Sequence, residues 1–203
     1  MNIWRTIRPA ACLLLLSGAV AQAAPITFDL RAPSIEAIDE VNSFSLSLGG
    51  VTATLTAQPL VFDGHPLLLN QTASAFGVNV FDTTCGGAED SDELDNGCVG
   101  ESIQIVFDTN VFLNSLRVSS FGASDQGLAT IGASLFAINS TGDHALGNTF
   151  LAAGDPWTIA YIAGNGFSFD RFTVTAPEPA SLLLFALGGG LVVSRRHRRK
   201  QAR

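Results

Sequence analysis

The residues best suited to bind a ligand are concentrated in one segment, from Cys85 to Glu101. Carboxylates this close repel one another unless a cation screens them, and calcium accepts roughly six to eight oxygen ligands at flexible geometry. The segment is a candidate calcium site, and a solvated acidic loop that holds no ion is the competing interpretation. The expected ligands come from Asp90, Asp92, Asp95, Asn96 and Glu101, and Glu89 and Glu93 add to the charge without any basic residue between them.

The spacing of these residues departs from an EF-hand. Asp90, Asp92 and Glu101 fall at positions 1, 3 and 12 of such a loop. Leu94 and Asp95 then occupy positions 5 and 6, where an EF-hand needs a ligand and a glycine. A strand pattern follows in place of a helix. The predicted site is therefore a loop of a β-domain and not an EF-hand.

The cysteines predict one disulfide. Of the three in the chain, Cys12 lies in the apolar leader described below, which leaves Cys85 and Cys98. An isolated pair in an oxidising compartment is typical of a disulfide. It would close a short loop and contribute about 3 kcal/mol on the chain-entropy account. The wide spacing of the two cysteines and the lack of further ones give a zinc site little support.

Catalytic patterns are weak. The sequence contains no Gly-x-Ser-x-Gly and no His-Glu-x-x-His. His65 and His144 have the surroundings of surface loops. Trp157 and Tyr161 could form a platform for a sugar ring, but at strand spacing the pair indicates core packing. We expect that the protein is not an enzyme.

Both ends of the chain carry targeting patterns. Residues 1–23 have a positively charged start, which contains Arg5 and Arg8, and then an apolar stretch. They end in Ala21-Gln22-Ala23, a small-x-small cleavage site. We expect a secretory signal peptide and a mature chain that starts after it.

At the other end, Pro177-Glu178-Pro179 precedes an apolar run, Ala180 to Val193, and a basic cluster, Arg195 to Lys200. As a helix the run is about 21 Å long. This is short of a hydrocarbon core of ~30 Å, but the flanking arginines can extend it by snorkelling. The basic cluster should stay in the cytoplasm, and the prolines keep the motif extended.

This ordered set resembles the PEP-CTERM sorting signal of exported bacterial proteins, over Ala176 to about Lys200. The resemblance implies processing by an exosortase, a membrane transpeptidase-like protease, with Pro177, Glu178 and Pro179 as its recognition residues. It also implies a membrane-anchored precursor that later reaches the cell surface or the extracellular space. An ordinary C-terminal membrane anchor is the alternative.

The span between the two ends is strongly acidic. Residues 24–179 hold all 18 acidic residues and three of the 11 basic ones, Arg31, Arg117 and Arg171, so the net charge of this span is −15, against −7 for the whole chain. Such a surface repels nucleic acid and anionic lipid, and we expect no nucleic-acid partner.

The elements that must position these residues are β-strands. Ser43–Leu48 and Val51–Thr56 alternate polar and apolar residues around Gly49-Gly50, which predicts a hairpin. A short helical pattern occurs near Ser34 to Val41. Further strands are predicted at Ile103–Phe107, Val111–Ser119, Leu128–Ile138, Trp157–Ile162 and Phe167–Val174.

The sequence thus predicts an all-β protein with three parts: a signal peptide (1–23), an antiparallel, jelly-roll-like β-sandwich (24–175), and a sorting signal with a transmembrane helix (176–203). We expect a structural or adhesive protein of the envelope or extracellular matrix. The alternative is a carbohydrate-binding module, calcium-dependent or not, whose partner is an extracellular polysaccharide.

Overall fold

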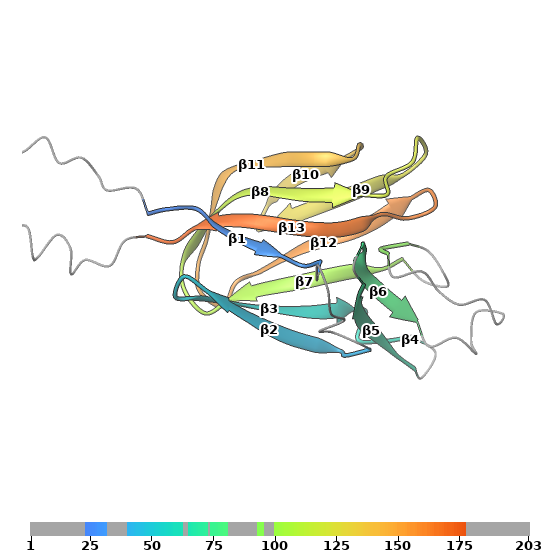
Figure 1. The fold of residues 1–203 in the computed structure, drawn as a ribbon, viewed down its shortest axis with the longest axis horizontal. Coiled ribbons are helices and arrows are strands. Elements are labelled where there is room, and N and C mark those ends of the chain that lie inside the picture. The colour runs from blue at the N-terminus through green and yellow to red at the C-terminus, as the bar shows by residue number, and fades with distance from the viewer. Residues whose placement is uncertain are drawn as a thin grey trace, which may run out of the picture.

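The structure is a computed structural model that describes residues 23–31, 40–62, 65–72, 74–80, 93–95 and 100–177. Within these residues the chain forms thirteen strands, β1 to β13, and every strand pairing is antiparallel (Figure 1). Two larger sheets pack face to face, so the predicted antiparallel β-sandwich is confirmed.

Three sheets make up the described domain. The first sheet has the order β1 (Ile26–Asp29), β13 (Ser168–Thr175), β8 (Val111–Ser119) and β11 (Gly142–Leu151). The second sheet has the order β10 (Ser134–Ile138), β9 (Gln126–Ile131), β12 (Pro156–Ala163), β7 (Ser102–Phe107), β3 (Val51–Gln58) and β2 (Ser43–Leu48). The third sheet is β4 (Val61–Phe62), β5 (His65–Gln71) and β6 (Phe76–Val80).

The polar–apolar alternation of β3 and β7 decides which side of the second sheet faces the core. Every second residue from Val51 to Ala57 is buried, as it is from Ile103 to Phe107. On the other side, hydroxyl pairs join β2 and β3, with Ser45 Oγ 2.8 Å from Thr54 Oγ1 and Ser47 Oγ 3.0 Å from Thr52 Oγ1. A one-residue slip would exchange the two faces, so burial fixes the register of the predicted hairpin.

Aromatic rings fill the space between the two large sheets. Phe172 lies at the centre, stacked on Phe28 at a centroid distance of 4.9 Å. Phe107, Trp157 and Phe169 surround it at centroid distances of 5.9, 5.8 and 5.9 Å. The three strands β1, β13 and β7 therefore share one contact cluster, although they come from both ends and the middle of the chain.

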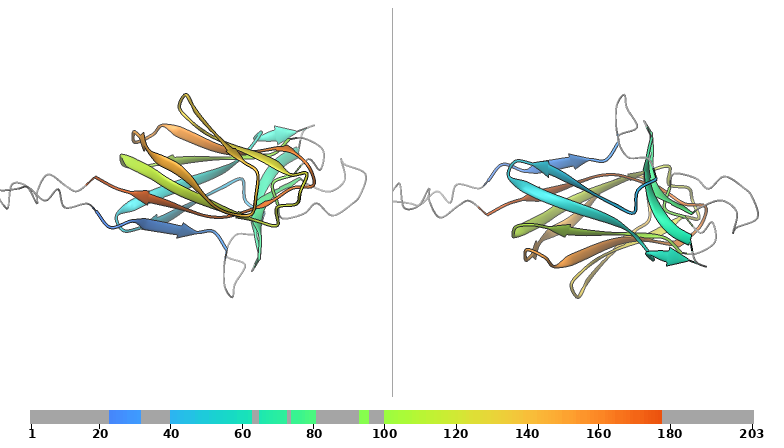
Figure 2. Two further views of the ribbon diagram at one scale, coloured as in Figure 1. Left: turned by 90° about the horizontal axis from the view of Figure 1, so that it is seen from above. Right: turned by 90° about the horizontal axis from the view of Figure 1, so that it is seen from below.

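The third sheet lies across the end of the sandwich that is opposite the described chain ends (Figures 1 and 2). The Phe76 amide donates to Ser168 Oγ at 2.9 Å, which joins β6 to β13. The Glu93 backbone crosses directly above Gly77, where a Cβ atom would lie 2.4 Å from the Glu93 carbonyl carbon. Glycine is therefore required at position 77 for this crossing.

The structure corrects some element boundaries. The predicted strand Leu128–Ile138 is two strands, because a turn at Gly132 with φ 56° separates β9 from β10. The helical pattern near Ser34 falls mostly on residues 32–39, which lie outside the described residues, and Val41 pairs with Leu69 in a β-bridge.

We predict that Phe172→Ala lowers the free energy of unfolding by about 3–5 kcal/mol, because it removes the ring at the centre of the aromatic cluster. Urea unfolding measures the loss. Phe150→Ala is the control, since Phe150 is 52% exposed and its replacement should change stability by no more than about 0.5 kcal/mol. Equal losses in the two variants would contradict this account of the core.

Candidate functional site

Two of the five residues predicted to bind calcium lie in the described structure. Asp95 and Glu101 are both buried. Glu101 Oε2 accepts a hydrogen bond from the Asp95 amide at 3.0 Å, and the Glu101 amide donates to the Asp95 carbonyl at 3.3 Å. The Tyr161 amide of β12 donates to the Glu101 carbonyl at 2.9 Å. Glu101 therefore holds the base of the acidic segment against the second sheet.

The rest of the predicted calcium site lies outside the described residues: Asp90, Asp92 and Asn96, together with both members of the predicted disulfide, Cys85 and Cys98. Among the residues that are described, no group of three or more His, Cys, Asp or Glu side chains is arranged to hold a metal ion. One oxygen of Glu101 is already committed to the Asp95 amide, which reduces what Glu101 can offer to a cation.

The side chains considered for catalysis or sugar stacking take structural positions where they are described. Trp157 is 1% exposed and meets Phe169 edge-on at a centroid distance of 6.1 Å, as the core-packing interpretation predicted. The Tyr161 hydroxyl donates to the Gly164 carbonyl at 2.8 Å. His144 Nε2 lies 2.8 Å from the Ser140 carbonyl, four residues earlier in the chain. The backbone of His65 belongs to β5.

The main electrostatic feature of the described domain is the buried carboxylate of Asp170, on β13. Its Oδ1 accepts hydrogen bonds from Ser119 Oγ at 2.6 Å and Ser168 Oγ at 3.3 Å. Its Oδ2 lies 3.3 Å from Arg31 Nη1 and 3.5 Å from Arg117 Nε. An unpaired buried charge would cost several kcal/mol, so these four groups are what allow Asp170 to be fully buried.

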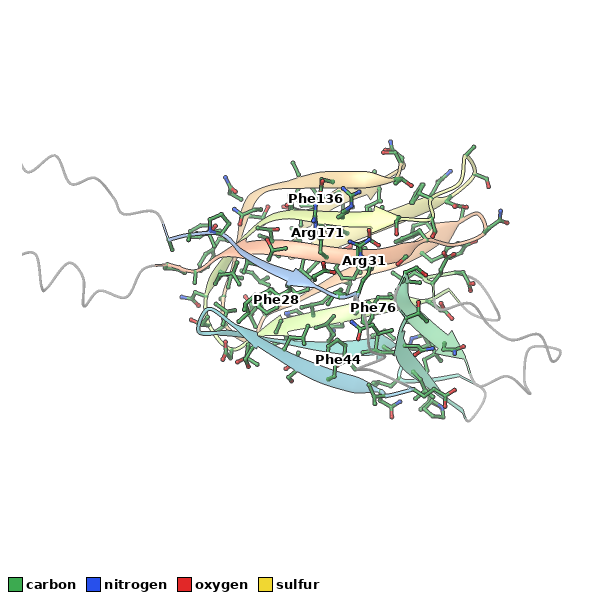
Figure 3. All side chains as sticks on the ribbon, viewed as in Figure 1. Phe28, Arg31, Phe44, Phe76, Phe136 and Arg171 are labelled. Carbon is green, nitrogen blue, oxygen red and sulfur yellow. The ribbon has the colours of Figure 1, made fainter. Side chains whose placement is uncertain are left out.

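A second carboxylate continues this network at the surface. Figure 3 labels two of the arginines involved, Arg31 and Arg171. Asp143 on β11 accepts hydrogen bonds from Arg117 Nη1 at 3.0 Å and from Arg171 Nη2 at 3.2 Å. Partial burial acts to raise the pKa of Asp143, but the hydrogen bonds and charges of Arg171 and Arg117 outweigh it and hold that pKa below its usual range. Asp29 also pairs with Arg31, at 3.7 Å.

All three arginines of the span 24–179 therefore meet acidic partners on the first sheet. They are Arg31, Arg117 and Arg171, and their partners are Asp29, Asp143 and Asp170, so this group has no net charge. The sequence analysis missed the cluster. The signal for this cluster in the sequence was the scarcity of arginine, because three cations in so acidic a span are expected to pair with carboxylates. Which carboxylates they find depends on pairings across β1, β13, β8 and β11.

The sorting motif begins where the described structure ends. β13 ends at Thr175, and Pro177 is exposed and outside any strand. One residue, Ala176, separates the last strand from the motif. The rest of the predicted tail, from Glu178 on, and the predicted leader, apart from Ala23, lie outside the described residues. In the part that is described, no helix has the length and apolar character needed to cross a membrane.

We predict that Asp143 contributes to stability at neutral pH and that this contribution disappears in acid. Its pKa in the folded protein is below the ordinary value of 3.8, so its stabilisation is complete above that pH and is lost as the pH falls through the folded-state pKa. Asp143→Asn should lower the unfolding free energy by roughly 0.2–1 kcal/mol at pH 7, the range of exposed ion pairs.

Urea unfolding of both proteins from neutral pH down to about pH 2 measures this difference. The gap between them should be constant above the ordinary value of 3.8 and should narrow below it. A gap that widens in acid would contradict the assigned direction of the pKa.

Comparison with known proteins identifies the tail. Residues 175–200 match the PEP-CTERM protein-sorting motif. No curated protein matches the chain. Among solved structures, the domain is similar to the Podospora anserina GH26-CBM35 β-(1,4)-mannanase at 13% identity and a TM-score of 0.35.

That match covers 78% of this chain and 29% of the mannanase chain, and so low a TM-score carries no argument about function. The tail is more informative, because the matched residues include the three that the sequence analysis had assigned to recognition: Pro177, Glu178 and Pro179. This chain therefore carries a PEP-CTERM protein-sorting motif behind a β-sandwich domain, and the motif marks it as an exported, cell-surface-sorted substrate of an exosortase.

Proposed function

We propose that this protein is a structural or adhesive component of the bacterial envelope or extracellular matrix, and not an enzyme. The observation that carries the proposal is the direct junction between the sandwich and the sorting motif, with Thr175 the last residue of β13 and Pro177 exposed two residues later. With such a junction, the folded domain lies directly beside the site of processing. In this proposal residues 180–193 anchor the precursor, and processing near Pro177 to Pro179 then leaves the domain at the cell surface or outside the cell.

The surface chemistry of the described domain supports a structural role. Rows of short hydroxyl side chains cover the outer side of β2 and β3, and Thr27 Oγ1 meets Thr173 Oγ1 at 3.1 Å on the first sheet. The strongly negative charge of the span keeps copies apart in solution. A hydroxyl-rich, acidic surface suits contact with hydrated polymers more than it suits a dry catalytic cleft.

We also propose that the sandwich is a jelly roll. In such a fold the first and last strands are neighbours in one sheet, and most connections cross from one sheet to the other. Here β9 and β10 form a hairpin within the second sheet. The order β1-β13-β8-β11 opposite β7-β12-β9-β10 agrees with this arrangement. Strands β2 to β6 then form an insertion, of which β2 and β3 widen the second sheet.

The alternative function is carbohydrate binding. Trp157 cannot serve as a platform for a sugar ring, because its indole ring is buried. The exposed aromatic pair on the first sheet, Phe112 and Phe150, has ring planes tilted by 59° and so presents no flat surface for a sugar ring. We therefore favour the structural role. A glycan array, read with and without calcium, distinguishes the two functions.

We further propose that the acidic segment binds calcium and that Cys85–Cys98 closes the loop around it. The density of carboxylates supports the cation, and the anchoring of Asp95 and Glu101 supports a loop held at its base. At a hundredfold excess over Kd, calcium would stabilise the folded state by roughly 2.7 kcal/mol. Thermal unfolding should then shift upward by several degrees relative to chelator.

Asp92→Ala should abolish this calcium-dependent shift, because it removes a proposed ligand. Asp155→Ala should preserve it, because Asp155 lies in the turn before β12. Melting temperatures in millimolar calcium and in chelator, at fixed ionic strength, measure both. Glu101 is the wrong position for this test, since its loss would destabilise the fold with or without calcium. Wild-type protein that melts identically in the two conditions would leave the segment as a solvated acidic loop.

We predict that Glu178→Ala blocks processing and leaves the basic cluster Arg195 to Lys200 attached to the protein. The reason is that Glu178 is the one charged residue of the recognition motif. Intact-mass analysis of the membrane and medium fractions from an exosortase-containing strain measures the outcome. Thr175→Ala is the matched control, three residues upstream, and should be processed normally. If Glu178→Ala protein were cut as wild type, the tail would be a plain anchor.

A further inference from the structure

One face of the sandwich carries an exposed aromatic pair close to the point where the sorting tail leaves. Phe112 on β8 and Phe150 on β11 are 37% and 52% exposed, and their ring centroids are 5.4 Å apart. In the sheet register Phe112 is opposite Phe150 on one side and Thr175 on the other. The three residues therefore form one row across the first sheet, and the row ends at the last residue of β13.

The tail fixes how far this row can be from the membrane that the precursor is proposed to span. Ala180, where the apolar run begins, is five residues after Thr175. Even fully extended, this stretch reaches about 17 Å. Neighbouring strands are about 4.8 Å apart, so Phe150 lies about 10 Å from Thr175 across the sheet. The aromatic pair is thus held near the bilayer surface for as long as the tail is attached.

The charge distribution decides which face can approach a lipid surface. The acidic span as a whole repels anionic lipid. The outer side of the first sheet is different, because its three arginines are balanced by three aspartates. The immediate neighbours of the pair are uncharged, with Asn114 Nδ2 donating to Asn148 Oδ1 at 2.6 Å and Thr175 Oγ1 donating to Asn114 Oδ1 at 2.9 Å.

We propose that Phe112 and Phe150 dock this face onto the interfacial region of the bilayer while the precursor is anchored, and that processing releases the contact. The inference rests on the proposed membrane anchor at residues 180–193. Phe side chains on the apolar face of a membrane-bound segment bury at the boundary between headgroups and acyl chains, where their rings leave water. Two half-exposed rings are a small apolar area, so the contact depends on the tether and does not persist in the cleaved domain.

The test places a reporter in the row and a matched reporter elsewhere. Phe150→Trp puts an indole on the proposed docking face, and Ile162→Trp puts one on β12, at a residue with nearly equal exposure, 53%. The full chain is reconstituted in phosphatidylcholine vesicles with or without brominated acyl chains. The wild-type tryptophan emission is subtracted from that of each variant, which leaves the emission of the new indole. We expect the brominated lipid to quench the emission from position 150 and to leave that from position 162 unchanged.

Three outcomes would overturn the proposal. If the brominated lipid quenched the two positions equally in chains that float with the vesicles, the domain would be anchored but not docked through this face. If the chains did not float with the vesicles, the proposed membrane anchor would be contradicted, and this inference would fail with it. A blue shift at position 150 that grows with protein concentration in the absence of lipid would assign the face to a second copy of this chain. Phe112→Trp repeats the test should the first variant misfold.

Discussion

The buried carboxylate of Asp170 ties together the three neighbouring strands on which the first sheet depends. It lies on β13. Its partners are Arg31, two residues after the end of β1, then Arg117 and Ser119 near the end of β8, and Ser168 on β13 itself. The Leu30 amide donates to the Asp170 carbonyl at 2.8 Å, so the backbone of the same residue also holds the chain that follows β1. A buried charge is stable only with its full set of partners, and this requirement specifies one arrangement of the three strands.

The position of Asp170 depends in turn on an irregularity in β13. Phe169 and Phe172 both point into the aromatic core, although regular alternation would place them on opposite sides. The pairing of β13 with β8 shifts register between Phe169 and Arg171, which is the signature of a bulge. The bulge lets the core keep both rings and turns Asp170 toward the arginines. Apolar packing and ion pairing are thereby satisfied by neighbouring residues of one strand.

The distribution of charge follows from this arrangement and bears on function. The three arginines of the span 24–179 are gathered on the first sheet, where Asp29, Asp143 and Asp170 pair with them, while the remaining acidic residues of the span belong to other segments. Charge is therefore balanced over the outer side of the first sheet, from which the tail leaves. In the anchored precursor proposed above, this balanced face is the one next to the tail.

The sequence by itself determined the local features of this protein. Alternation from Ser43 to Thr56 predicted the hairpin and its buried side, because a strand with one apolar face permits one register. The order of motif, apolar run and basic cluster predicted the sorting signal, because such targeting patterns are read from contiguous residues. The tertiary structure decided what depends on residues far apart in the chain. Examples are the pairing of β1 with β13, the charges gathered around Asp170, and the row from Phe150 to Thr175, since only the strand order brings these residues into contact.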